Sequence, residues 1–161
     1  MMTRTVVVAL AGATSLLFRT GEVAPSPSAT RMVSFVVSPS LKDVAVAVYD
    51  SERPVIFYNP ALMGGFTPEM RTFFFAHEYG HLAFHHTRAA VLRLPPAGRD
   101  SLLQKRELEA DCFAARELAS IARAAVNAAA RFFSRIGSRQ TDHEHPTGAQ
   151  RAARILACLP S

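Results

Sequence analysis

Two histidines and a glutamate in the HEYGH segment at residues 77–81 have the types and spacing of a metal-dependent hydrolytic site. On an α-helix, positions i and i+4 lie one turn apart on the same face, so the imidazoles of His77 and His81 can reach one Zn²⁺ ion. Glu78 would then lie beside the open coordination position, where it could take a proton from a zinc-activated water. The alternative is a pair of ordinary helical histidines that bind nothing.

The surrounding residues predict the helix that this chemistry needs. Thr67 offers an N-cap hydroxyl, Pro68 suits the first helical position, and Glu69 favours the positive end of the helix dipole. An apolar stripe at helical spacing then contains both histidines, its members being Met70, Phe73, Phe74, His77, His81 and Phe84. We expect a helix over residues 67–87 with the histidines on its buried face.

A zinc hydrolase site also needs a third protein ligand, with the fourth position left for water. The extended pattern HExxHxxGxxH does not apply, because Phe84 and Arg88 stand where it requires glycine and histidine. The third ligand is therefore expected in another segment.

A second predicted helix, over residues 101–118, supplies candidates for that ligand. It opens with a capping-box pattern from Ser101 to Gln104. Glu107 and Asp111 then interrupt an otherwise apolar face, and a buried carboxylate is costly unless it is paired or bound to a metal. We expect Glu107 to be the third ligand and Asp111 to accept a ring N–H of His77 or His81, whereas pairing with nearby arginines is the alternative.

The order of motifs resembles that of the HtpX-like and CAAX-prenyl-protease-like gluzincins. These motifs are HEYGH, ELEAD at residues 107–111, and His145-Pro146-Thr147 followed by Arg151 and Arg154. The resemblance covers roughly residues 55–158 and implies that His77, His81 and Glu107 bind one Zn²⁺ ion per chain. The chain lacks the membrane spans of the large members, so it is more similar to the minigluzincins, and processing of prenylated peptides is not implied.

Further residues take their expected roles from this resemblance. His86 falls where many soluble relatives carry a histidine after the motif. The resemblance brings His145 near the site, where it would stabilise the developing oxyanion. A structural role for His145 as a helix cap ahead of Pro146 is the alternative.

The function expected from these residues is hydrolysis of a peptide or protein substrate by a zinc metalloendopeptidase with Glu78 as general base. One alternative is a regulatory or protein-binding module that retains zinc but has little peptidase activity. Another is a zinc hydrolase acting on a different bond. The intact Glu78 argues against an inactive enzyme, since loss of the base is the simplest route to one.

Residues 1–30 differ in character from the rest of the chain. Arg4 precedes an uncharged run over residues 5–18, which has the length of a signal-peptide apolar region, and residues 20–30 have the composition of a linker. We expect a signal peptide or N-terminal anchor plus linker at 1–30 and a zinc metallopeptidase domain at 31–161. The protein would be exported, to the periplasm or outside the cell, or tethered to a membrane; a cytoplasmic protein is the alternative.

Composition is that of one globular domain, with 161 residues, 49% hydrophobic and 19% charged. The net charge of +5 comes from scattered arginines without a recognition motif, so no nucleic-acid partner is expected. The oligomeric state is not predicted. Cys112 and Cys158 form either a disulfide or two buried thiols.

The expected fold is α+β and zincin-like, with a small N-terminal sheet followed by the HExxH helix and a helical C-terminal half. Strands are expected within residues 32–37, 44–49 and 54–58, and helices within 67–87, 101–118, 120–136 and 147–158. The resemblance assigns the substrate-binding sheet edge to residues 55–58. The alternative is an internal strand whose side chains fill the core.

Overall fold

A short three-stranded sheet stands at the N-terminal side of the domain. The structure is a computed structural model that describes residues 32–49 and 53–160, so the segment expected at residues 1–30 lies outside the described residues. The strands are β1 (Ser34–Val37), β2 (Ala45–Tyr49) and β3 (Pro54–Tyr58). All three lie within the segments expected from their β-branched composition.

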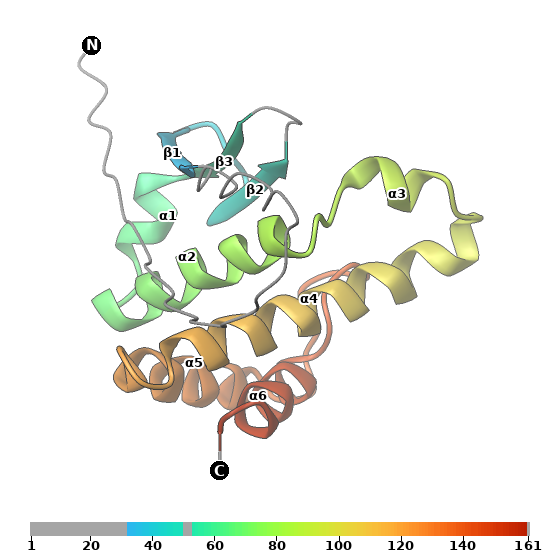
Figure 1. Cartoon of the computed structure of the whole chain (residues 1–161). Helices are drawn as coiled ribbons and strands as arrows, with labels where there is room; N and C mark the ends of the chain where they lie inside the picture. The colour runs from blue at the N-terminus through green and yellow to red at the C-terminus, as the bar shows by residue number, and fades with distance from the viewer. Residues whose placement is uncertain (1–31, 50–52, 161) are drawn as a thin grey trace, which may run out of the picture.

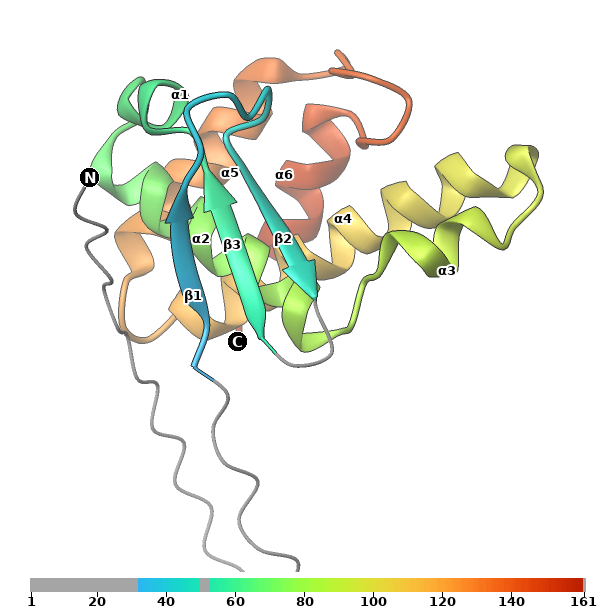
Figure 2. The same cartoon turned by 90° about the horizontal axis from the view of Figure 1, so that it is seen from above.

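The central strand of this sheet is β3, which runs between β1 and β2 (Figure 2). It pairs in parallel with β1 and antiparallel with β2. The expectation of a substrate-binding edge at residues 55–58 was therefore wrong, because both sides of β3 are already paired. β2 is the edge strand that runs toward α3 and α4.

Six helices follow among the described residues, and together they make up most of the domain. They are α1 (Pro60–Gly64), α2 (Pro68–Ala83), α3 (Arg88–Leu92), α4 (Pro96–Leu118), α5 (Arg123–Ile136) and α6 (Gly148–Ala157). A three-stranded sheet with this helical bulk is an α+β fold.

The start of α2 is as expected, with the Thr67 hydroxyl accepting a hydrogen bond from the N–H of Met70. Its expected end at residue 87 was wrong. The helix ends at Ala83 because His85 has a φ of 52°, in the left-handed region that a helix cannot continue through.

α4 begins earlier than expected, at Pro96 instead of residue 101. The predicted cap at Ser101 was wrong, because Ser101 lies inside the helix and Pro96, with its preset φ, occupies the first turn. At α6, Thr147 is the N-cap and exchanges hydrogen bonds with Gln150. Thr147 thus takes the capping role that was the alternative for His145.

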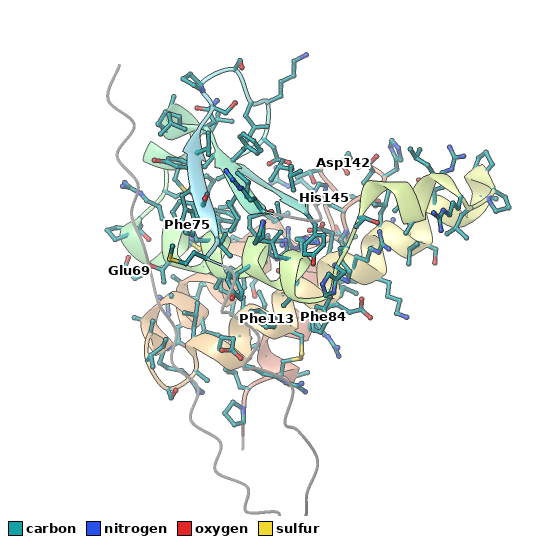
Figure 3. The ribbon with its side chains drawn as sticks, turned by 45° about the horizontal axis from the view of Figure 1, so that its top comes forward. Glu69, Phe75, Phe84, Phe113, Asp142 and His145 are labelled. Atoms are coloured by element: carbon teal, nitrogen blue, oxygen red, sulfur yellow. A yellow bond between two sulfur atoms is a disulfide. The ribbon has the colours of Figure 1, made fainter. Side chains whose placement is uncertain are left out.

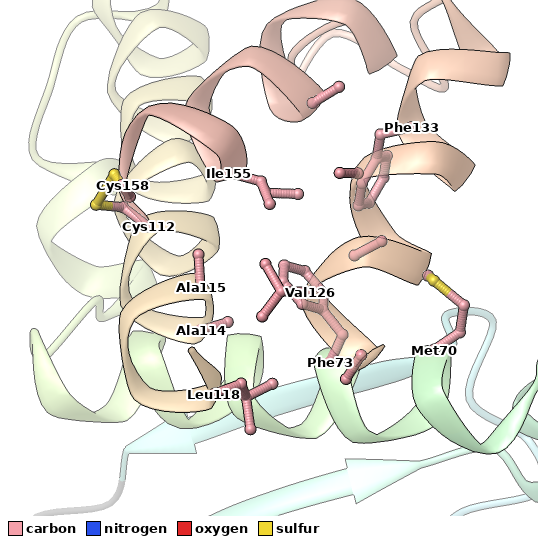
Figure 4. Close-up of a cluster of buried hydrophobic side chains, with 14 residues drawn as sticks. Met70, Phe73, Cys112, Ala114, Ala115, Leu118, Val126, Phe133, Ile155 and Cys158 are labelled. Atoms are coloured by element: carbon pink, nitrogen blue, oxygen red, sulfur yellow. A yellow bond between two sulfur atoms is a disulfide. The ribbon is translucent and has the colours of Figure 1, made fainter. Parts of the chain in front are cut away.

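The layers of the fold are arranged around α2. In Figure 1 the sheet lies on one side of α2, and α4, α5 and α6 lie on the other. A smaller core joins the sheet and α1 to α2 through Ile56, Met63 and Leu82. The larger core lies among the four long helices and includes the fully buried Phe73 and Ile155 (Figure 4). The HEYGH helix is therefore the central element of the domain.

A disulfide joins Cys112 of α4 to Cys158 just beyond α6 (Figure 4). Both cysteines are buried, and the bond holds together the two helices that carry Asp111 and Arg151. Of the two arrangements left open for these cysteines, the structure has the disulfide. Within residues 32–49 and 53–160, no helix is both long and apolar enough to span a bilayer.

Candidate metal centre

Three side chains converge between α2 and α4. His77 and His81 come from α2, Glu107 comes from α4, and one potential ligand atom of each lies within 4.8 Å of the others. The two Nε2 atoms are 3.1 Å apart. The Glu107 carboxylate lies 3.1 Å from Nε2 of His77 and 3.2 Å from Nε2 of His81.

This geometry fits a zinc ion. Four ligands at about 2.0 Å from a tetrahedral zinc are separated from one another by about 3.3 Å. The closest contacts among the three side chains, 3.1 and 3.2 Å, are near that spacing, with His77 facing Oε2 of Glu107 and His81 facing Oε1. Two imidazoles and one carboxylate are also a donor set of catalytic zinc sites, in which the fourth position stays open. The group can therefore hold zinc, while the identity of the metal stays a prediction.

Asp111 orients the ring of His77. Its Oδ1 lies 2.9 Å from Nδ1 of His77 and accepts that ring's N–H, which leaves Nε2 directed at Glu107. Arg151 on α6 donates to both oxygens of Asp111, from Nε at 2.8 Å and from Nη2 at 2.7 Å. Nη2 also lies 3.3 Å from Nδ1 of His77, but two donors cannot bond to each other, so the carboxylate takes both protons.

Arg151 was not predicted as part of the site. The guanidinium lies 4.1 Å from the ring centre of Phe133, and its side chain is only 10% exposed. Asp111 thus makes both the expected contact with a histidine and the alternative contact with an arginine. An arginine on the apolar face of α6, beside Ala152 and Ile155, is the signal that could have identified it.

The carboxylates give this group the negative charge that binding of a cation requires. Burial lowers the pKa of His77, but Glu107 and Asp111 outweigh it and raise that pKa to about 10. Burial raises the pKa of Glu107, but the neighbouring His77 and His81 hold it well below its usual value. Glu107 thus stays ionised, and its charge favours a positive ion between the imidazoles.

Glu78 lies beside the three converging side chains without joining them. Its Oε2 accepts a hydrogen bond of 2.7 Å from the backbone N–H of Ala47 on β2. Burial raises the pKa of Glu78, as suits a proton acceptor. The carboxylate lines a cavity of about 330 Å³ together with His77, His81 and His145.

His145 reaches the rim of the same cavity from the loop between α5 and α6. Its Nδ1 lies 2.8 Å from Oδ1 of Asp142, and the two side chains lie next to each other in Figure 3. Its Nε2 lies 3.8 Å from Oε2 of Glu107. Asp142 was not predicted, and its position three residues before His145 was the signal that the sequence offered. Asp142 also accepts a hydrogen bond from the backbone N–H of Glu144.

Comparison with known proteins identifies the family. A protein-family model described as the IrrE N-terminal-like domain, Peptidase_M78, matches residues 35–128, more than half of the chain. This chain belongs to the IrrE N-terminal-like domain family. No curated protein and no solved structure gave a match.

The match covers nearly all of the sheet together with α2 and α4, and so contains His77, His81, Glu107 and Glu78. It ends before His145 and Arg151, so these two residues lie beyond the part of the chain that the family model describes. The family supports a minimal metallopeptidase-like domain of the zincin type. The narrower resemblance to HtpX-like and CAAX-prenyl-protease-like enzymes is not confirmed.

An open groove of about 830 Å³ leads away from the metal centre of this IrrE N-terminal-like domain. It shares His81 and Glu107 with the centre and runs along β2, which forms one wall. The opposite wall comes from α3 and the first half of α4, which extend together from the body in Figure 2. Val91 and Leu103 are among its apolar lining residues. The sequence did not reveal this groove, because its walls come from separate segments.

Proposed function

We propose that this protein is a zinc metalloendopeptidase in which His77, His81 and Glu107 hold one zinc ion. The observation that carries the proposal is the convergence of two imidazole nitrogens and the two oxygens of one carboxylate, with contacts of 3.1–3.2 Å and the Glu78 carboxylate beside them. When bound, zinc lowers the pKa of a water molecule to about 7 and polarises the scissile carbonyl. The glutamate ligand is the reason for proposing a gluzincin-type, zincin-like architecture.

Two side chains would act on the substrate in this proposal. Glu78 takes a proton from the attacking water and delivers it to the leaving amine. The hydrogen bond from Ala47 at 2.7 Å holds one of its oxygens, so the other is available for that transfer. His145 donates from Nε2 to the developing oxyanion, and Asp142 keeps its ring in that orientation through Nδ1.

The substrate we propose is an extended peptide or protein segment bound along β2. Among the described residues, β2 pairs with β3 on one side, and its other side lines the groove of about 830 Å³. Backbone pairing with a sheet edge would align a peptide across the metal centre without requiring a particular side chain. Nucleic acid is not proposed as a partner, because the basic residues form no recognition motif.

We further propose that the protein works in an oxidising compartment, either exported or tethered to a membrane through its N-terminus. The buried disulfide between Cys112 and Cys158 supports this location, since such bonds persist outside reducing compartments.

A zinc-retaining regulatory or protein-binding module is the second candidate function. It is favoured by the family match, because IrrE-like members of this metallopeptidase-like family can be regulatory. In that case the groove along β2 would hold a protein segment without cleaving it. Glu78 would then have no chemical role, and its replacement would leave function unchanged.

The decisive experiment is digestion of a denatured proteome by the zinc-loaded protein, with and without a chelator. Glu78→Gln is the matched control, because the amide oxygen can still accept the hydrogen bond from Ala47. We expect chelator-sensitive cleavage by the wild type, a loss of about 10²–10⁴-fold in Glu78→Gln, and about one zinc per chain in both. Stoichiometric zinc without any chelator-sensitive cleavage would support the regulatory module instead.

A further inference from the structure

We propose that His86 is a positioning residue. It accepts a hydrogen bond from the ring of His81, which fixes the tautomer of His81, and it donates a hydrogen bond to Glu109. The inference rests on the proposed zinc site and adds a residue that contacts the proposed ligand His81 without contacting zinc. It is carried by contacts on the side of His81 that faces away from the ligand group.

The ring of His86 is folded back onto His81. Directly after α2, His85 adopts a left-handed φ of 52°, and the N–H of His86 then bonds to the carbonyl of His81 at 2.9 Å. This turn brings the two Nδ1 atoms within 3.0 Å of each other. The His86 side chain is 7% exposed, and Phe84 stacks on its ring with centres 5.6 Å apart.

The other ring nitrogen of His86 has a carboxylate partner. Nε2 of His86 lies 3.2 Å from Oε2 of Glu109 on α4. Glu109 is two residues from Glu107 and points to a different face of the helix. α4 therefore contributes one carboxylate to the ligand group and another to the residue behind His81.

Zinc binding determines every proton position along this chain of contacts. Nε2 of His81 points at His77 and Glu107, so it must present a lone pair to the metal. The proton of the neutral His81 ring is then on Nδ1 and is donated to Nδ1 of His86.

His86 must in turn carry its own proton on the opposite nitrogen. Because Nδ1 of His86 accepts, its proton is on Nε2, where the Glu109 carboxylate accepts it. Only this set of tautomers satisfies all three contacts with zinc on His81.

The two proposed zinc ligands, His77 and His81, consequently donate hydrogen bonds to different kinds of acceptor. His77 donates to the fully buried carboxylate of Asp111, whereas His81 donates to a neutral imidazole. A partner that hydrogen-bonds the remote nitrogen orients the ligating ring and commonly changes metal affinity 10–100-fold. His86 should therefore affect zinc binding without contacting zinc.

Two variants separate this role from simple packing. His86→Phe keeps a ring that can stack on Phe84 but removes the acceptor for His81. His86→Asn keeps an acceptor oxygen near the position of Nδ1. We expect zinc affinity, measured by competition with a chromophoric chelator, to fall about 10–100-fold in His86→Phe and to recover largely in His86→Asn. The melting temperature of each metal-free variant serves as the control for folding.

Nitrogen-15 NMR of the histidine rings in the zinc-loaded wild type reads the tautomers directly. We expect a proton on Nδ1 of His81 and on Nε2 of His86. A proton on Nδ1 of His86, or wild-type zinc affinity in His86→Phe, would overturn the inference while leaving the metal site intact. Failure of the wild type to bind about one zinc per chain would overturn the proposed function and this inference together.

Discussion

A side-chain carbon on Gly80 would lie 3.1 Å from the Cα atom of Ala110, so the contact between α2 and α4 depends on a glycine at this position. Gly80 directly precedes the proposed zinc ligand His81, and Ala110 directly precedes Asp111. The same added carbon would lie 3.2 Å from the side chain of Phe113. The spacing of the two helices at the metal centre is thus set by the absence of one side chain.

Gly80→Ala should therefore weaken zinc binding. Relieving the contact with Ala110 requires a backbone shift of a few tenths of an ångström, which moves Glu107 away from the histidines. We expect at least a tenfold loss of zinc affinity, since ligand placement tolerates little error. Gly98→Ala is the matched control: an added carbon there meets nothing within 4 Å. That control should gain roughly 0.5–1 kcal/mol of stability and keep its zinc affinity.

Replacing Arg151 by methionine should strongly destabilise the fold. It would remove both guanidinium hydrogen bonds from the fully buried Asp111 carboxylate and leave His77 as its remaining partner, a loss of about 3–5 kcal/mol in the free energy of unfolding. Arg154→Met, on the same helix but exposed, should change stability by no more than about 0.5 kcal/mol. Urea denaturation of the metal-free proteins measures both, and equal stability of the two variants would contradict the buried pair's importance.

Zinc binding should become tighter as the pH rises. In the metal-free protein the pKa of His77 is raised to about 10 by Glu107 and Asp111, which outweigh its burial, so zinc must displace a proton at neutral pH. We expect release of about one proton per zinc and a roughly tenfold gain in affinity per pH unit between about pH 6 and 8. Calorimetry in buffers of different ionisation enthalpy measures this release, and an enthalpy independent of buffer would contradict it.

Loss of the proton on His77 should also make the metal-free fold less stable as the pH rises, whereas zinc binding becomes tighter. Because the pKa of His77 in the folded state exceeds its value of 6.5 in the unfolded chain, protonation stabilises the fold fully below about pH 6.5. That contribution is lost as the pH rises through about 10. Thermal melts of chelator-treated protein across this range would show it.

Removing the disulfide should lower stability. The bond closes a loop with a sequence separation of 46 residues, for which the chain-entropy contribution is about 4 kcal/mol. The double replacement of Cys112 and Cys158 by alanine should lower the melting temperature, and reductant should do the same to the wild type alone. Alkylation of both cysteines in freshly purified protein that is denatured without reductant would show that the bond is absent.

His145→Ala should reduce turnover while leaving zinc content and melting temperature unchanged. Loss of an oxyanion donor typically costs about 10²–10³-fold in kcat. Asp142→Asn should cost less, because the amide oxygen can still accept from Nδ1 of His145. Kinetics on a peptide found in the proteome digest measure both effects. Lower stability with unchanged kcat would instead assign His145 to holding the loop.

The sequence by itself indicated the three strands, the four longer helices and the residues along the HEYGH helix, but not the short helices α1 and α3. The i, i+4 spacing of His77 and His81 fixes them on one helical face wherever that helix lies, because the backbone sets the geometry. The interrupted apolar stripe of α4 likewise indicated Glu107 and Asp111, since a buried carboxylate needs a partner. The structure brings these side chains together as expected, because each inference about their placement depends on neighbours within one helix. Their roles stay predictions.

Only the tertiary structure decided which partners meet across the chain. Arg151 reaches Asp111 from α6, and β2 instead of β3 borders the groove, because helix packing and strand order set these contacts. His86 turns back to His81 through the left-handed residue at the end of α2, a conformation that helical spacing did not predict. Contacts of this kind depend on how distant segments pack, and no local pattern of residues encodes that arrangement.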